Sequence, residues 1–341
     1  MKNKIITSLV ILLIVLFIVL NAYAEEKLIR IGYFPNITHS QAIIGMAKGT
    51  FQKNLGNNVR IVTKVFNAGP SVIEAMFAGE LDLAYIGPNP AINGYVKSNG
   101  QALRIIAGVT SGGAGLVIRK DSGIKKIEDL HGKKIASPQL GNTQDVALRG
   151  WLKDHGFILK ERGGDVQVIP IQNPDQLTLF IKKEIDGAWT VEPWVSRLIK
   201  EGEGELFLDE RSIWPKGQFV TANVIVNKKF LEEHRDLVKS FISTHIELTI
   251  WINNNISEAK KIINAEIKRI TGKALPDEVI DGAFSRLKVT YDPIKDSLYT
   301  CARWAFAQGF LGKNFPDISG IYDLSILNEI LKEKGLNTIN E

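Results

Sequence analysis

The order of strand-like and helix-like segments is the feature that most restricts the fold of this 341-residue chain. Apolar strand patterns "LIRIGYF", "VRIVTKVF" and "LDLAYIG" are each followed by a segment with helical spacing, beginning with "SQAII", "SVIEA" and "NPAIN". The order repeats from Ile127, with strands "KKIAS", "DVQVIPI" and "IDGAWT" and helices that begin near Thr143, Pro174 and Glu192. This alternation predicts an α/β fold with mainly parallel sheets and helices on both faces.

Two α/β lobes are expected, because the pattern occurs twice in a chain of this length. Strands "ALRIIAGV" and "GLVIRK" flank a predicted loop "TSGGA", and "FVTANVIV" is the last predicted strand. Amphipathic helices are predicted over 230–254, 257–271, 276–287, 296–310 and 324–334. We expect lobe 1 to comprise residues 25–116 and 220–341, with the C-terminal helices packed back on it, and lobe 2 to comprise residues 117–219.

The N-terminal 24 residues have the pattern of a secretory signal peptide. Lys2 and Lys4 precede an apolar run that ends at Leu20, and "NAYA" supplies a cleavage site after Ala24. The alternative is an uncleaved anchor helix, but the run is shorter than the roughly 20 residues that span a bilayer. We therefore expect a periplasmic protein. Its single cysteine, Cys301, excludes an internal disulfide and a cysteine-rich metal site.

Charge and histidine placement argue against two other kinds of partner. The formal net charge is +5, and the basic residues are scattered, so nucleic acid is a poor candidate. The five histidines have no metal-ligand spacing, and "SGGAG" lacks the frame of a phosphate-binding loop. The sequence predicts no cofactor and no metal.

The loops after the predicted strands are polar but carry no lysine or arginine. They are "PNITHS", "NAGPS", "GPNP", "TSGGAG", "SPQLGNTQ" and "VEPW", and most are rich in Ser, Thr, Asn, Gln and Gly. In parallel α/β sheets, ligands bind beyond the carboxyl ends of the strands, where helices begin. Backbone N–H groups and hydroxyls at helix N-termini suit a small anion, which is the predicted ligand.

Several of these polar residues have a simpler explanation as helix caps. Ser40 and Asn89 could each be an N-cap, and Ser71 with Glu74 has the spacing of a capping box. One cap would also suffice for the helix that follows "GNTQ", so the surplus of polar residues there favours a ligand-binding role.

The larger side chains in and beside these loops could either contact a ligand or stabilise the fold. His39 could contact a ligand or cap a helix, and no second His or Cys lies nearby to make it a catalyst. Glu192 could favour its own helix N-terminus or meet a ligand ammonium group. Trp194 or Trp189 could form an apolar wall.

The segments "FNAGPSVIEAMFAGELDLAYIGPNPAI", "TSGGAGLVIRK" and "EDLHGKKIASPQLGNTQDVALRGWL" resemble the substrate-binding proteins of ABC importers for aliphatic sulfonates, taurine and nitrate. The resemblance covers essentially the whole chain after the signal peptide. It implies a type II periplasmic-binding-protein fold, in which two lobes joined by a hinge close on a ligand in the cleft between them. It also implies an ABC permease and ATPase as partners. The cleft positions that it implies are Asn36, His39, Ser40, Ser71, Asn89, Ser111, Gly112, Asn142, Thr143, Gln144, Glu192 and Trp194.

The resemblance implies a monomeric receptor that captures a small organic anion, an aliphatic sulfonate or taurine, with the ligand's tail against Trp194. Taurine binders in this family use a carboxylate for the amine, which Glu192 could supply, whereas His39 stands where small polar residues are common. Three alternatives remain at this level. A nitrate or bicarbonate receptor needs a smaller pocket, a thiamine-pyrimidine or menaquinone enzyme on the same fold needs a reactive cluster, and a sensory protein needs a signalling domain.

Overall fold

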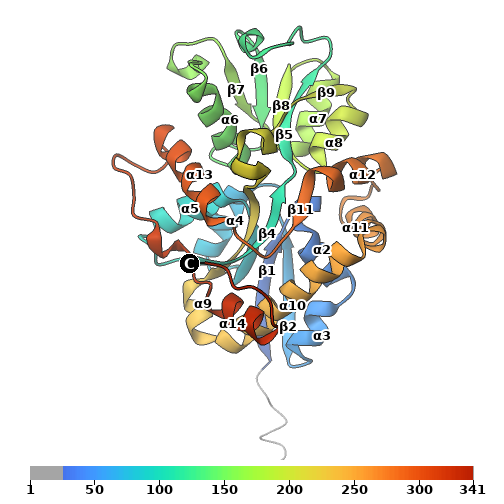
Figure 1. Cartoon of the computed structure of the whole chain (residues 1–341), viewed down its shortest axis with the longest axis vertical. Helices are drawn as coiled ribbons and strands as arrows, with labels where there is room; N and C mark the ends of the chain where they lie inside the picture. Colours follow the sequence, from blue (N-terminus) through green and yellow to red (C-terminus); the bar gives the residue numbers. More distant parts are fainter. Residues whose placement is uncertain (1–25, 341) are drawn as a thin grey trace, which may run out of the picture.

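Residues 26–340 are described by a computed structural model and contain two β-sheets, one above the other in Figure 1. The predicted signal peptide lies outside the described residues. Within the described part of the chain, no helix is both long enough and apolar enough to span a bilayer.

The lower sheet in Figure 1 has six strands in the order β11-β4-β10-β3-β1-β2. Their bounds are β1 Lys27–Tyr33, β2 Val59–Val65, β3 Leu83–Ile86, β4 Leu103–Gly112, β10 Val220–Asn227 and β11 Leu287–Val289. Strands β1, β2 and β3 are parallel, whereas β10 and β11 run antiparallel to their neighbours. The parallel register ends β1 opposite β2 at Tyr33 and Val65, so the loops after both strands begin at the same edge.

Helices cover both faces of this sheet. One face is covered by α2 (Ser40–Ala47), α3 (Thr50–Leu55), α10 (Arg235–Asn254), α11 (Ile256–Thr271) and α14 (Ser325–Glu333). The other face is covered by α4 (Gly69–Phe77), α5 (Pro88–Lys97) and α13 (Lys295–Ala307). The short helix α9 (Lys228–Glu233) follows β10 directly.

The upper sheet has five strands in the order β7-β6-β8-β5-β9. They are β5 Ala114–Arg119, β6 Lys134–Ser137, β7 Gln167–Pro170, β8 Gly187–Val191 and β9 Gly204–Asp209. Helix α6 (Thr143–Asp154) packs on one face, and α7 (Asn173–Ile181) and α8 (Trp194–Lys200) pack on the other. Strands β6, β7 and β8 are parallel, so α6, α7 and α8 all begin at the same edge.

The chain passes between the sheets without the predicted "TSGGA" loop. Strand β4 continues to Gly112 and β5 begins at Ala114, so the loop prediction is wrong. Gly112 and Gly113 have φ values of 75° and 76°, which other residues rarely adopt, and this pair redirects the backbone within two residues. The return passage lies between β9 and β10.

The C-terminal helices contact elements of both sheets, so the expectation that they pack only on lobe 1 is incomplete. Helix α12 (Asp277–Arg286) packs against α8, and α13 packs against α6 as well as α5 (Figure 1). The Trp304 indole N–H donates to an Asp154 carboxylate oxygen at 2.9 Å. Gly150 of α6 makes room for this indole, because a Cβ atom there would lie 2.4 Å from Trp304 Cγ.

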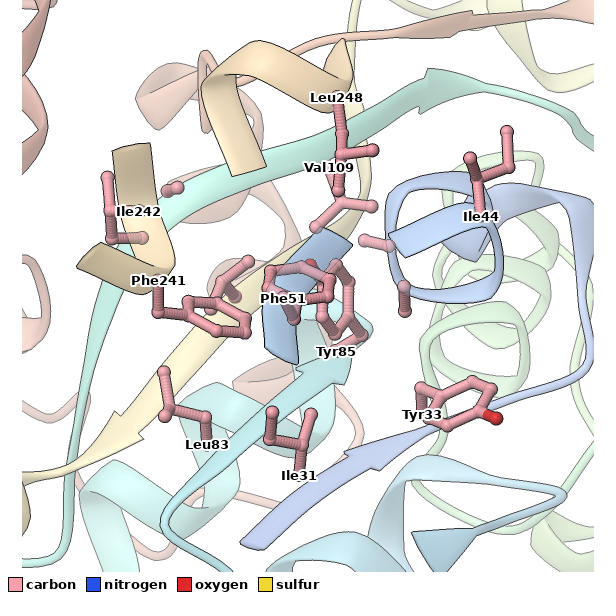
Figure 2. Packing of buried hydrophobic residues seen from close by; sticks show 14 of the residues in the cluster. Ile31, Tyr33, Ile44, Phe51, Leu83, Tyr85, Val109, Phe241, Ile242 and Leu248 are labelled. Carbon is pink, nitrogen blue, oxygen red and sulfur yellow. The ribbon is translucent and has the colours of Figure 1, made fainter. Parts of the chain in front are cut away.

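An aromatic core holds α3 and α10 on the lower sheet, as Figure 2 shows. The rings of Phe51 and Phe241 stack with centroids 4.7 Å apart, and Tyr85 meets Phe241 edge-on at 6.2 Å. All three side chains are fully buried, and each such burial contributes about 1.5–3 kcal/mol to stability. This packing fixes the sheet whose carboxyl edge carries the first set of polar loops.

Candidate ligand-binding site

A cavity of about 330 Å³ lies where the carboxyl edges of the two sheets meet. From the lower sheet it is lined by Pro35 and Asn36 after β1 and by Phe66 and Asn67 after β2. From the upper sheet it is lined by the starts of α7 and α8. The remaining lining comes from these two helices, from α11 and from the segment after it: Asn173, Pro174, Pro193, Trp194, Arg197, Ile267, Thr271, Lys273, Ala274 and Leu275.

Two side-chain hydrogen bonds cross the space between the sheets at this cavity. The Trp194 indole N–H donates to Asn36 Oδ1 at 3.2 Å, and the Asn67 amide donates to Gln172 Oε1 at 3.2 Å. The two edges are therefore in direct contact, as they would be in a binding protein with its lobes closed.

Three helix N-termini approach one another elsewhere between the two sheets, and of their residues and the loops before them only Phe66 and Asn67 line the cavity. Asn67 leads into α4, and Gly69 of α4 lies so near α5 that a Cβ atom would be 2.3 Å from Pro90 Cγ. Gly87 at the start of α5 lies equally near α6, since a Cβ atom would be 2.3 Å from Thr143 Oγ1. The Asn89 N–H also donates to Thr143 Oγ1, at 3.4 Å.

These helices begin without a side-chain cap. In the described chain, α4, α5, α6 and α7 have no hydrogen bond from a first-turn N–H to the N-cap side chain. A helix N-terminus carries a partial positive charge and free N–H donors, so an anion there satisfies both. The arrangement can hold an oxyanion without a basic side chain.

The cap predictions for Ser40, Ser71 and Asn89 are wrong. Helices α4 and α5 begin earlier than expected, at Gly69 and Pro88, and both have a proline in the first turn, which needs no N–H partner. Ser71 and Asn89 therefore lie inside the first turn. Ser40 is the first residue of α2, and its hydroxyl donates to the Ile37 carbonyl at 2.5 Å.

Asn142, Thr143 and Gln144 lie together at the start of α6, and all three are buried. Their loop is organised by Asp145, which the sequence did not single out. Asp145 is fully buried and accepts hydrogen bonds from the Ser137 hydroxyl, the Gly141 N–H and the Arg149 guanidinium, at 2.6, 2.9 and 2.9 Å.

His39 is a buried, neutral side chain that does not line the cavity. Its Nδ1 accepts the Phe34 N–H at 3.2 Å, and the two rings stack with centroids 4.6 Å apart. Burial lowers the pKa of His39 to about 3, so the ring is uncharged at neutral pH. His39 ends the short helix Ile37–His39 and directly precedes α2.

The Glu192 carboxylate accepts hydrogen bonds from other residues of the protein. Its carboxylate accepts the Ser196 N–H and hydroxyl at 3.1 and 3.0 Å and pairs with Arg286 of α12 at 3.0 Å. Burial raises the pKa of Glu192, and Arg286 and Ser196 oppose that rise. Glu192 therefore accepts an N–H at the start of its own helix, as predicted. It also forms an ion pair with Arg286 of α12, 94 residues away in sequence.

Of the twelve predicted positions, only Asn36 and Trp194 line the cavity of about 330 Å³, and Ser111 and Gly112 are among those that do not. Ser111 lines a different cavity, of about 460 Å³, that Arg211, Lys216 and Lys288 also line. The Gly112 carbonyl accepts the Thr221 hydroxyl at 2.6 Å. The structure does not bring these two residues to the cavity that Asn36 and Trp194 line.

The family model for the NMT1-like family matches residues 22–267. The chain belongs to the NMT1-like family. It is 28% identical over 206 residues to the taurine-binding periplasmic protein of Escherichia coli strain K12, covering 60% of this chain and 61% of that protein. It is 25% identical over 317 residues to a Bacillus subtilis strain 168 protein named "Putative aliphatic sulfonates-binding protein", covering 91% of this chain and 90% of that protein.

Solved structures show the same fold. The alkanesulfonate-binding protein SsuA from Xanthomonas axonopodis pv. citri, bound to MOPS, has a TM-score of 0.71 at 19% identity, covering 85% of this chain and 96% of that one. The periplasmic nitrate-binding protein NrtA from Synechocystis PCC 6803 has a TM-score of 0.70 at 16% identity, covering 91% and 89%. The predicted type II periplasmic-binding-protein fold and the predicted family are confirmed.

Proposed function

We propose that this chain is the substrate-binding receptor of an ABC importer, and that it captures a small organic anion, an aliphatic sulfonate or taurine, for delivery to a membrane permease. The names of the relatives support this, and one structural observation carries it. The loops after β1 and β2 of the lower sheet and the starts of α7 and α8 of the upper sheet line one cavity between the sheets, and α7 begins there without a side-chain cap. The protein acts as a periplasmic monomer, binds rather than converts its ligand, and has the permease and its ATPase as partners.

The chemistry of the site suits a permanently charged head group. A sulfonate keeps its charge at any biological pH, and a buried charge is tolerable only when it is fully hydrogen-bonded. The helix N-termini supply N–H donors, and the polar side chains beside them supply more. The proposed ligand contacts are Asn36 and Trp194, which line the cavity, and five residues at helix starts outside its lining: Ser71, Asn89, Asn142, Thr143 and Gln144.

The size of the cavity favours an organic anion over nitrate or bicarbonate. Its volume of about 330 Å³ is at the lower end of the roughly 300–1,000 Å³ typical of pockets for small organic ligands. Closure of the upper sheet, whose first strand β5 begins at Ala114, against the lower sheet would enclose the ligand, with Gly112–Gly113 and the segment before β10 as the hinge.

A thermal-shift panel on residues 25–341 tests the proposal. The ligands are alkanesulfonates, taurine, nitrate, bicarbonate, sulfate and a thiamine pyrimidine precursor. A ligand present at a hundred times its Kd adds about 2.7 kcal/mol of stability, which raises the midpoint by several degrees. A rise with a sulfonate or taurine supports the proposal. A rise with nitrate, bicarbonate or the pyrimidine alone contradicts it.

The double variant Asn142→Ala/Thr143→Val tests the site itself. It removes two polar groups from the start of α6, and we expect ligand binding to weaken at least tenfold while the unliganded midpoint changes little. The matched control is Asn57→Ala/Thr178→Val, which makes the same two changes at exposed positions. Equal affinity in the two double variants would contradict the assignment of the α6 N-terminus.

A further inference from the structure

The charges around the cavity distinguish between the two ligands that the proposed function allows. Its lining, taken over the described residues, contains Arg197 and Lys273 but no aspartate or glutamate. Asn36, Asn67 and Asn173 add neutral polar groups, and the rest is mostly apolar. A site of this composition offers an ammonium group no carboxylate partner.

One carboxylate, that of Glu201, is shared by the two cations. Glu201 accepts two hydrogen bonds from Arg197, at 2.7 and 3.0 Å, and one from Lys273 at 3.5 Å. One negative charge thus faces two positive charges, which leaves a formal charge of +1 on this side of the cavity. The Arg197 guanidinium also lies 4.6 Å from the centroid of the Trp194 ring, and both side chains line the cavity.

Glu192, the other carboxylate at the start of α8, is not free to receive a ligand amine. It is fully buried, and its two oxygens accept hydrogen bonds from Ser196 and Arg286. A ligand ammonium would have to displace the Arg286 guanidinium and leave that charge without its buried partner, which is costly.

Most of the remaining surface of the cavity is apolar. Phe66, Trp194, Ile267 and Leu275 come from four separate segments and line the same space. A methylene chain transferred from water to such a surface gains about 0.8 kcal/mol for each buried CH₂ group.

We infer that the ligand carries an apolar tail without an ammonium group, so that the receptor binds alkanesulfonates and rejects taurine. This inference rests on the proposed function. An ammonium group entering this cavity would lose its hydration, find no carboxylate and approach Arg197 and Lys273.

Propane-1-sulfonate and taurine form a matched pair for the test, because they have the same number of non-hydrogen atoms and differ by a methyl group in place of the ammonium group. Isothermal titration of residues 25–341 should give a Kd for taurine at least tenfold higher than for propane-1-sulfonate. If taurine binds as tightly or more tightly, the inference is wrong and the proposed function stands. If no sulfonate binds, the proposed function is wrong, and the inference falls with it.

The variant Lys273→Glu tests whether the positive charge of the cavity causes the weaker binding of taurine. Its side chain is 73% exposed, so the fold should tolerate the change. The ratio of the taurine Kd to the propane-1-sulfonate Kd should fall at least threefold. The control Lys97→Glu makes the same charge change at an exposed residue at the other end of α5, about 15 Å along the helix from its N-terminus. An unchanged ratio in Lys273→Glu, or an equal fall in both variants, would overturn the charge argument.

Discussion

The sequence around a polar residue predicts where in the fold the residue lies, but not which distant side chains it contacts. The polar loops could be placed at the sheet edges from the strand–helix order alone. The ion pair of Glu192 could not, because Arg286 lies on another helix far along the chain. Arg197 and Lys273 were missed for the same reason, since only the folded chain brings α8 and the end of α11 to one cavity.

Glu210 makes stability depend on pH in an unusual direction. It is buried in the passage between β9 and β10, where its carboxyl group accepts the indole N–H groups of Trp189 and Trp214 at 2.8 and 3.2 Å. Burial raises the pKa of Glu210 from 4.5 to about 7, and the two indoles oppose that rise. A raised carboxyl pKa stabilises the folded state most below pH 4.5, and that contribution is lost as the pH rises towards 7.

The variant Glu210→Gln lacks this pH-dependent contribution. Relative to the parent, its free energy of unfolding should therefore increase by about 2–3 kcal/mol between pH 5 and pH 8, at 1.36 kcal/mol for each pKa unit. Urea denaturation at both pH values measures the difference. Glu184→Gln removes the same charge from an exposed side chain and serves as the control. A difference between variant and parent that does not change with pH would show that the Glu210 carboxyl group titrates normally.

Elements were predicted well where their pattern is long and poorly where it is short. The central strands and the helices α11 to α14 lie close to their predicted ranges. The edge strands β9 and β11 were missed, whereas the edge strands β2 and β7 were predicted; β11 has only three residues, too few for a recognisable pattern. The predicted helix from Ser40 divides into α2 and α3 because Gly49 has a φ of 64°, which ends the first helix.

The close contact between α5 and α6 predicts that a methyl group added at Gly87 weakens ligand binding. Gly87 has ordinary backbone angles, so alanine is not strained there, but its Cβ atom would lie 2.3 Å from Thr143 Oγ1 on the other side of the cleft. Gly87→Ala should hold the two helix N-termini apart and weaken ligand binding at least tenfold. The thermal midpoint without ligand should change little. Isothermal titration checks the affinity, and undiminished binding would show that the ligand-bound form does not need this close approach.

At the scale of the whole molecule, the C-terminal helices limit how the two sheets can move apart. Helix α13 contacts α6 through Trp304 and Asp154, and α12 contacts α8 through Arg286 and Ser196. Opening of the cavity must either break these contacts or carry the helices along with the upper sheet. The sequence could predict two lobes, but these bridges depend on side chains at least 90 residues apart.

A chemical cross-link across the cavity would show whether the ligand closes the two sheets together. Asn67 and Gln172 are exposed and hydrogen-bonded to each other at 3.2 Å, so cysteines at both positions should react with a short bismaleimide when the edges are in contact. The native Cys301 should not compete, because it is 4% exposed and burial raises the pKa of its thiol.

We expect cross-linking of Asn67→Cys/Gln172→Cys to be several-fold faster with a saturating alkanesulfonate than without it, and we expect the cross-linked protein to release bound ligand more slowly. Mass spectrometry of timed samples measures the first effect, and ligand dissociation into excess buffer measures the second. Each single cysteine variant is the control for reaction at one end only. If the ligand does not change the cross-linking rate, the contact between the two edges exists without ligand, and binding must then proceed by a route other than closure of the cleft.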